Sequence, residues 1–309
     1  MRRLRCTLVC FLICVVSVFA DSMAINLEND CFALPKTDDN YSHGTEIVYT
    51  ADSPLWVFDN WDLGLEQTMY TPPLIKTDAL QLGEHPYCGY LSLNFIGEQW
   101  FKSSESTELT LQHQLGFGTV GPHAHSEQSQ KTIHKWLGCK EPKGWKWQIA
   151  NEAIVQYQLC ANLNWRFYGS ENGFSALLIP RATIDVGGFK DMIAVGTDLK
   201  LGWRVPKNVG SNMILSMPSW RGSNKFSCFT LVGAEGRCVL HDTSIDGGFF
   251  RDSIHTEESE TWVGELHWGL GLSYSAVEID YFVFTRSNEL ENSNATRPNY
   301  GRVSLKVSF

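Results

Sequence analysis

Polar and apolar residues alternate along the last ten positions of the chain. Val303, Leu305, Val307 and Phe309 are apolar, and the positions between them are polar. Because successive side chains of a strand point to opposite faces, this segment predicts a strand with one apolar and one polar face. An edge strand of a soluble β-sandwich would show the same pattern. Its final aromatic residue is typical of the last strand of a bacterial outer-membrane β-barrel, which the barrel assembly machinery reads.

The same alternation recurs along the chain and predicts a single domain. An even number of antiparallel strands is typical of a single-chain bacterial barrel. The expected fold is therefore all-β: a twelve-stranded antiparallel transmembrane β-barrel with one short helix in an extracellular-side loop. Side chains can fill much of so narrow a lumen, which favours an enzyme or a small channel over a wide pore. The strands are expected at 22–28, 43–51, 61–70, 87–97, 107–117, 148–159, 174–187, 192–204, 226–240, 260–274, 276–286 and 299–309.

The lengths of the connections suggest which side of the membrane each one faces. Extracellular loops of such barrels are long and periplasmic turns are short. The short turn at 187–190 is therefore expected on the periplasmic side. The long segments expected on the extracellular side are 71–86, 118–147, 205–225 and 241–259.

Residues 1–20 have the pattern of a secretory signal peptide. Three arginines precede an apolar run from Leu8 to Phe19, and cleavage is expected after Ala20. The run is shorter than the roughly 20 residues that a membrane helix needs. Residues 21–309 are expected to form the β-barrel domain, which would cross the bacterial outer membrane many times and act as a monomer.

Composition agrees with a membrane barrel. Charged residues make up 19% of the chain and aromatic residues 12%, which suits a lipid-facing wall with aromatic girdles. The net charge of −9 argues against binding to nucleic acid. The compartment permits disulfides, and their pairing stays open. The cysteines outside the signal are Cys31, Cys88, Cys139, Cys160, Cys228 and Cys238.

The pattern becomes helical from Ser126 to Leu137. Ser126 is expected to cap the helix, and Gly138 is expected to stop it. Ile133, Trp136 and Leu137 form the predicted apolar stripe.

Gln130 and His134 are four residues apart, so both project from one face of this helix. A histidine beside an amide can position a water molecule or an acyl group. The alternative is a solvated histidine on a surface helix.

Oxygen-bearing side chains gather where the first strand ends and the second begins. Asn29-Asp30 closes the first, and 38–44 (Asp-Asp-Asn-Tyr-Ser-His-Gly) opens the second. Carboxylate, amide and hydroxyl oxygens suit Ca²⁺ better than a transition metal. These residue types also favour turns on their own account, so turn formation is the alternative.

Several short motifs, in order, resemble the outer-membrane lipid A 3′-O-deacylase family, LpxR. The resemblance extends from about residue 24 to 309. It rests on Asn29-Asp30, Asp39-Asn40-Tyr41-Ser42-His43-Gly44, Tyr70-Thr71-Pro72, Pro86-Tyr87-Cys88-Gly89, Gly121-Pro122 with Gln130, His134 and Gly138, Pro142-Lys143-Gly144-Trp145 with Gln148 and Asn151-Glu152, and 246–253 (Asp-Gly-Gly-Phe-Phe-Arg-Asp-Ser).

This resemblance implies Ca²⁺-dependent hydrolysis of the 3′-linked acyloxyacyl ester of lipid A, the membrane anchor of lipopolysaccharide. His134 would be the general base, and Gln130 would orient the water or the substrate. Asp30 would hold Ca²⁺, while Asn29 and Ser42 would complete the surroundings of the oxyanion and the metal. No Gly-x-Ser-x-Gly motif is present, so a serine nucleophile is not expected.

The chain departs from the family pattern at several positions. Ser42 replaces the more usual threonine and keeps the hydroxyl. His43 replaces a small residue or asparagine, and it could crowd the site. His85 replaces an arginine. Lys140 follows the helix where one member has an acidic residue, and the neighbouring Glu141 is the substitute candidate for the metal.

Lys76 is the candidate contact to the lipid A phosphates, because phosphate attracts cations.

Two alternatives to lipid A deacylation stay open. The same hydrolysis by His134 and Ca²⁺ would serve a phospholipase or an acyltransferase that acts on another outer-membrane lipid. A non-catalytic barrel, either a porin or a surface antigen, is the second alternative.

Overall fold

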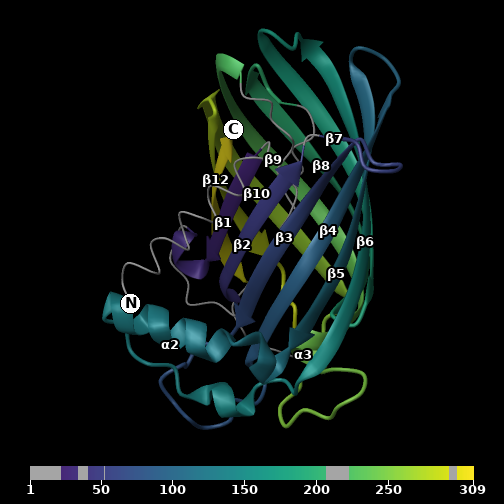
Figure 1. The fold of residues 1–309 in the computed structure, drawn as a ribbon. Coiled ribbons are helices and arrows are strands. Elements are labelled where there is room, and N and C mark those ends of the chain that lie inside the picture. Colours follow the sequence, from purple (N-terminus) through teal and green to yellow (C-terminus); the bar gives the residue numbers. More distant parts are fainter. Residues whose placement is uncertain (1–21, 34–40, 52, 207–222, 292–297) are drawn as a thin grey trace.

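A computed structural model of the protein describes residues 22–33, 41–51, 53–206, 223–291 and 298–309. Twelve antiparallel strands form one closed barrel (Figure 1). Among the described residues, no helix is long and apolar enough to cross a membrane. The predicted signal peptide lies outside the described residues, and so do Asp38, Asp39 and Asn40. The strands are β1 (Ser22–Asn29), β2 (Tyr41–Ala51), β3 (Asn60–Tyr70), β4 (Cys88–Lys102), β5 (Thr107–Val120), β6 (Glu152–Gly169), β7 (Phe174–Gly187), β8 (Lys190–Trp203), β9 (Ser223–Asp242), β10 (Trp262–Ser275), β11 (Val277–Arg286) and β12 (Asn299–Ser308).

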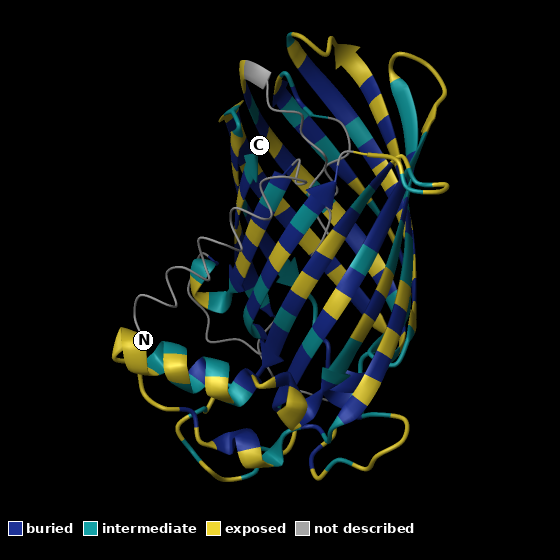
Figure 2. Cartoon of the chain, in the orientation of Figure 1, coloured by how far each residue is buried: buried dark blue, intermediate teal, exposed yellow. Residues whose placement is uncertain are grey.

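The final strand confirms the alternation that predicted it. β12 pairs with β1 and β11, and this pairing closes the barrel. Val303 and Leu305 are exposed on the outer face, while Arg302 and Lys306 are buried on the luminal face. Figure 2 shows the same alternation of exposed and buried positions along the strands of the wall. An apolar outer face and a polar interior are what a bilayer requires of a spanning barrel.

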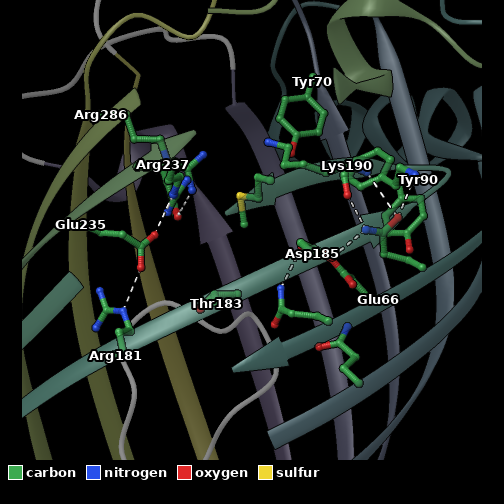
Figure 3. Close-up of a pocket in the computed structure, with 16 residues that line it drawn as sticks. Glu66, Tyr70, Tyr90, Arg181, Thr183, Asp185, Lys190, Glu235, Arg237 and Arg286 are labelled. Atoms are coloured by element: carbon green, nitrogen blue, oxygen red, sulfur yellow. Dashed lines mark hydrogen bonds and ion pairs between the residues drawn. The ribbon is translucent and has the colours of Figure 1, made fainter. Parts of the chain in front are cut away.

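Paired charges and aromatic rings fill much of the lumen. Arg181 binds Asp198 over 2.6 Å and Glu235 over 2.8 Å. Tyr300 packs against Tyr41, with ring centroids 4.7 Å apart. A polar cavity remains, and several of its lining side chains bind one another, as Arg181 and Arg237 do with Glu235 (Figure 3). The filled lumen agrees with the expectation that a wide pore is disfavoured.

Five short helical segments interrupt the barrel pattern, and four of them (η1, η2, α2 and η3) lie beside the candidate site. The predicted helix 126–137 is confirmed, and the single turn α3 was not predicted. The segments are η1 (Asp30–Phe32), η2 (Gly121–Ala124), α2 (Ser126–Leu137), η3 (Gly144–Trp147) and α3 (Thr243–Asp246).

The connections divide between two rims of the barrel. We call the rim that carries α2 the α2 rim. It also holds the connections after β1, β3, β7, β9 and β11, because antiparallel strands alternate in direction. Most of the long connections are here, which favours this rim as the extracellular side.

Two sequence predictions about these sides were wrong. The tight turn at 187–190 follows β7 and lies on the α2 rim, whereas β8 ends and β9 begins at the opposite rim. The segment predicted at 205–225 lies between these two strand ends, and its residues 207–222 are outside the described residues. The position of a connection depends on the order of the strands, whereas the prediction had used its length.

Contacts between loops tie the α2 rim together. The backbone N–H of Gly83 donates to Glu257 over 2.7 Å, and that of Ala150 donates to the hydroxyl of Ser253 over 2.9 Å. In addition, the carboxylate of Glu152, at the start of β6, accepts hydrogen bonds from the backbone N–H groups of Phe249 and Phe250 in the β9–β10 connection. These bonds join the β3–β4, β5–β6 and β9–β10 connections into one network.

Candidate active site

The first half of the candidate site lies on the outer face of the wall. The hydroxyl of Tyr281 donates to the carbonyl of Phe32 over 2.6 Å, and this bond holds η1 against the wall. Gly301 makes the close approach possible, because a Cβ there would lie 2.7 Å from Phe32. The neighbours of Tyr281 and Gly301 along their strands face the lumen, so these two residues face outward. Because η1 contacts both of them, η1 and the half-buried Asp30 lie outside the barrel.

The structure brings Asn29 and Ser42 together, as the sequence predicted. The Asn29 side-chain amide donates to the backbone carbonyl of Ser42, and its oxygen accepts from the backbone N–H of Cys31 over 2.9 Å. The Ser42 hydroxyl in turn shares a hydrogen bond with the hydroxyl of Thr71. A chain of polar contacts therefore crosses the rim ends of β1, β2 and β3.

The second half of the site begins where η2 and α2 meet the wall. Gln67 donates to the carbonyl of Ala124 over 2.6 Å, and the Ser126 hydroxyl donates to the carbonyl of Thr68 over 3.4 Å. Gly89 permits this contact, because a Cβ there would lie 2.5 Å from the Ser126 hydroxyl oxygen. The prediction that Ser126 caps α2 was wrong. The cap residue is His125, at φ 58°, and it makes no side-chain capping bond.

Gln130 is fixed by a buried aromatic cluster. Its side-chain oxygen accepts a 2.7 Å hydrogen bond from the indole of Trp145. Trp145 packs against Tyr87, with ring centroids 5.1 Å apart, and Met69 completes the cluster. Gly144 is needed here, because a Cβ would lie 2.3 Å from the Tyr87 ring. The cluster explains why the Gly144-Trp145 motif accompanies the helix.

His134 lies one turn beyond Gln130 and has a defined tautomer. Its Nδ1 is 2.6 Å from the backbone carbonyl of Lys140. Since a carbonyl oxygen can only accept, Nδ1 carries the proton, and Nε2 of the neutral ring is the basic nitrogen. The backbone carbonyl of Lys140 thus orients the His134 ring, a role for which the sequence had suggested an acidic side chain. The presence of lysine at position 140 therefore does not remove the contact that orients the ring.

The outer face of the wall between these two halves carries the side chain of His43. His43 faces outward from β2 beside Met69 of β3. Its Nε2 lies 2.6 Å from the Thr45 hydroxyl, so the ring follows the strand. This contact directs the polar nitrogen of His43 along the wall.

The remaining predicted residues lie elsewhere on the α2 rim. Lys76 is exposed in the β3–β4 connection. Glu141 binds Lys131 over 3.3 Å, and Lys131 also binds Glu127 over 2.9 Å. His85 is buried and stacks on Tyr70, with centroids 4.9 Å apart. Glu141 and His85 therefore have structural contacts of their own.

The apolar stripe predicted on α2 is not packed. Ile133 is half-buried, but Trp136 is 80% exposed and Leu137 is 72% exposed. The stripe therefore exists but is mostly uncovered, because only the first half of the helix contacts the wall. Gly138 does end the helix, at φ 69°.

The oxygen donors at the rim ends of β1, β2 and β3 fit a hard cation by their chemistry. Within the described ranges, no three His, Cys, Asp or Glu side chains converge as a metal group. The carboxylate of Asp30 and the oxygens around Ser42 and Thr71 are hard ligands, which suit Ca²⁺. The acidic pair 38–39, which precedes β2 in the sequence, lies outside the described residues.

Three contributors to the site were missed by sequence reasoning. They are the Thr71 hydroxyl, the Trp145 indole and the Lys140 carbonyl. The motifs Tyr70-Thr71-Pro72 and Gly144-Trp145 were visible, but neither indicated a contact. A backbone carbonyl leaves no signal in the sequence.

Comparisons with known proteins give a family for the chain and a solved structure of similar fold. A family model described as outer membrane protein LpxR matches residues 6–309. A solved structure of LpxR from Salmonella typhimurium has 17% sequence identity and a TM-score of 0.76, and the match covers 93% of this chain and 100% of that one. The β-domain of the Bordetella autotransporter BrkA has 11% identity and a TM-score of 0.49, with 94% and 100% covered. No curated protein matches.

Proposed function

Because the chain belongs to the LpxR family of outer-membrane lipid A deacylases, we propose that it removes the 3′-linked acyloxyacyl group of lipid A by Ca²⁺-dependent ester hydrolysis. His134 supplies the base, and the reaction takes place on the outer face of the barrel. The observation that carries the proposal is the hydrogen bond from His134 Nδ1 to the Lys140 carbonyl, which leaves Nε2 available as a base.

The proposed reaction needs one water molecule and no covalent intermediate. His134 Nε2 takes a proton from water as the water oxygen attacks the ester carbonyl carbon. The tetrahedral intermediate then collapses, the bond to the 3′ oxygen breaks, and the imidazolium returns its proton to that oxygen. The products are the free acyloxyacyl acid and a lipid A with a 3′ hydroxyl.

The other residues orient and stabilise. Gln130, whose side-chain oxygen is held by Trp145, shares a helix face with His134. Its side-chain N–H would bind the water or the ester oxygen. Asn29 and Ser42 fix the rim of β1 and β2 beside Asp30. Asp30 would hold Ca²⁺, which when bound supplies a positive charge that stabilises developing negative charge on the ester oxygen.

The location of these residues supports a lipid substrate over a transported solute. Asn29 and η1 lie outside the wall, on the side that faces lipid, and the lumen holds paired charges such as Arg181 and Glu235. A porin would need an open interior. A lipid hydrolase needs its site beside the leaflet, and a site on the outer face of the wall would meet that need.

Mass spectrometry with purified protein tests the proposal. The protein in detergent is incubated with lipid A, with Ca²⁺ or with excess chelator. We expect loss of the 3′ acyloxyacyl mass only with Ca²⁺. Unchanged lipid A, with cleavage of added phospholipid instead, would replace the proposal with the phospholipase alternative. No cleavage of either lipid by folded barrel would support a non-catalytic protein.

A further inference from the structure

The second half of α2 extends away from the wall with its apolar residues uncovered. Its first turn is held by the Ser126–Thr68 contact and the packing at Gly89. From there the helix projects sideways past the edge of the barrel rather than across its mouth (Figure 1). Trp136 and Leu137, in its last turn, are 80% and 72% exposed.

The outer face of the wall next to the helix presents an apolar surface of the same kind. Outward residues of β1, β2 and β3 are exposed along the membrane-spanning part of the barrel. They are Ile25, Leu27, Ile47, Leu63 and Leu65, with exposures from 37% to 49%. In a bilayer this surface is covered by acyl chains. A helix that leaves the rim sideways, over these strands, therefore extends toward lipid instead of toward the barrel mouth.

The helix geometry ties this apolar end to the site. Leu137 follows Gln130 by seven residues, or two turns, so it continues the face that carries Gln130 and His134. Trp136 lies about 100° further round the helix. Tryptophan favours the membrane interface, where its ring is apolar and its N–H can reach water. Lys135 points away from the face of Leu137 and can reach the headgroups.

We propose that Trp136 and Leu137 insert into the outer leaflet of the membrane and that α2 lies along the leaflet as an interfacial helix. The occupant of this apolar face is therefore lipid acyl chains rather than a protein partner. The continuity of the exposed helix end with the lipid-facing wall carries the proposal. It rests on the outer-membrane barrel and does not depend on the deacylase reaction. Its consequence is that His134 is held at the depth of the outer leaflet.

Fluorescence quenching tests the position of the helix end directly. Cys31 and Cys139, the exposed cysteines among the described residues, are replaced by serine. A single cysteine is then introduced by Leu137→Cys or Trp136→Cys, with Lys135→Cys as the matched control. Each variant is labelled with an environment-sensitive fluorophore and reconstituted in palmitoyl-oleoyl phosphatidylcholine vesicles. Quenchers are nitroxide-bearing lipids and aqueous iodide.

The proposal predicts that labels at 136 and 137 lose most of their emission to the nitroxide lipids and little to iodide. The label at 135 should be the most sensitive to iodide. Equal iodide quenching at all three positions would overturn the proposal. Protection from both quenchers together with a cross-linked dimer would also overturn it, because a second copy would then cover the face. If a substituted variant fails to fold, the natural Cys139 is labelled in Cys31→Ser, and strong iodide quenching without lipid quenching there counts against the proposal.

Discussion

The indole N–H of Trp145 donates a 2.7 Å hydrogen bond to the side-chain oxygen of Gln130, and both residues are buried. Trp145→Phe keeps an aromatic ring against Tyr87 but leaves the Gln130 oxygen without this donor. A buried polar group without its partner costs about 1–3 kcal/mol. We expect a lower rate of lipid A deacylation with the barrel intact, measured by mass spectrometry and by heat-modifiable electrophoretic migration.

Trp147→Phe is the matched control for this prediction. The Trp147 indole also donates a hydrogen bond, over 2.9 Å, but its acceptor is the carbonyl of Asp78 in the exposed loop. This variant should keep near-normal activity. An equal loss in both variants would mean that the Trp145 bond does not act through Gln130.

The shared hydroxyl contact between Ser42 and Thr71 makes a second prediction. Thr71→Val keeps the shape of the side chain and removes the hydrogen bond to Ser42. We expect reduced deacylation, because the Ser42 hydroxyl is then free to turn away. Thr71→Ser keeps the hydroxyl and should keep most of the activity. Full activity in Thr71→Val would show that this contact does not matter to the reaction.

The predicted Ca²⁺ requirement can be assigned to Asp30. Asp30→Asn removes the negative charge and should weaken the response of activity to added Ca²⁺. Asp78→Asn, on the same rim and paired with Lys146 over 3.5 Å, is the control and should behave like the unmodified protein. A Ca²⁺ titration of activity for the three proteins is the measurement. An unchanged titration in Asp30→Asn would place the ion elsewhere.

His85 predicts a pH dependence of stability at the α2 rim. His85 lies in the β3–β4 connection and stacks on Tyr70, the last residue of β3. Burial lowers the pKa of its ring. Above its ordinary pKa of about 6.5, the ring is neutral in both the folded and the unfolded protein. Below that pH the unfolded state binds the proton more readily, so the folded rim should lose stability as the pH falls.

Hydrogen exchange of residues 71–87 at several pH values measures this effect. His85→Phe keeps an aromatic ring on Tyr70 and cannot titrate. The extra exchange below about pH 6.5 should therefore be smaller in this variant. The same acid response in His85→Phe would assign it to other groups, such as Asp242 and Lys190, whose charges act on His85.

His43 was identified from the sequence as a residue that could crowd the site, and the structure predicts a small effect. Because the Nε2 of His43 is bonded to the Thr45 hydroxyl, the ring lies along the strand and leaves the space next to the wall free for substrate. His43→Asn should change deacylation little. A large gain of activity, measured by the same mass spectrometry, would show that the ring obstructs the substrate.

Much of the fold follows from the sequence because the strand period is local. The alternation at Val303 and Leu305 predicted both the strand and its outer face. The helix 126–137 was predicted from a change in period and a terminal Gly138. The role of Ser126 was not predictable, because the carbonyl of Thr68, 58 positions away, binds its hydroxyl.

The site was predicted in part for the same reason. Asn29 and Ser42 lie at adjacent strand ends, so their contact follows from strand order. Trp145 reaches Gln130 only through the folding of the long β5–β6 connection. The carbonyl that orients His134 belongs to the backbone, and any residue at position 140 could provide it.

The most direct test of the central claim is the lipid A mass spectrum of cells that express the protein in the outer membrane. Unmodified protein, His134→Ala and the neighbouring control Lys135→Ala are compared at equal amounts of folded barrel. We predict loss of the 3′ acyloxyacyl mass with the unmodified protein and with Lys135→Ala, and intact lipid A with His134→Ala. Deacylation that persists in His134→Ala would contradict the account.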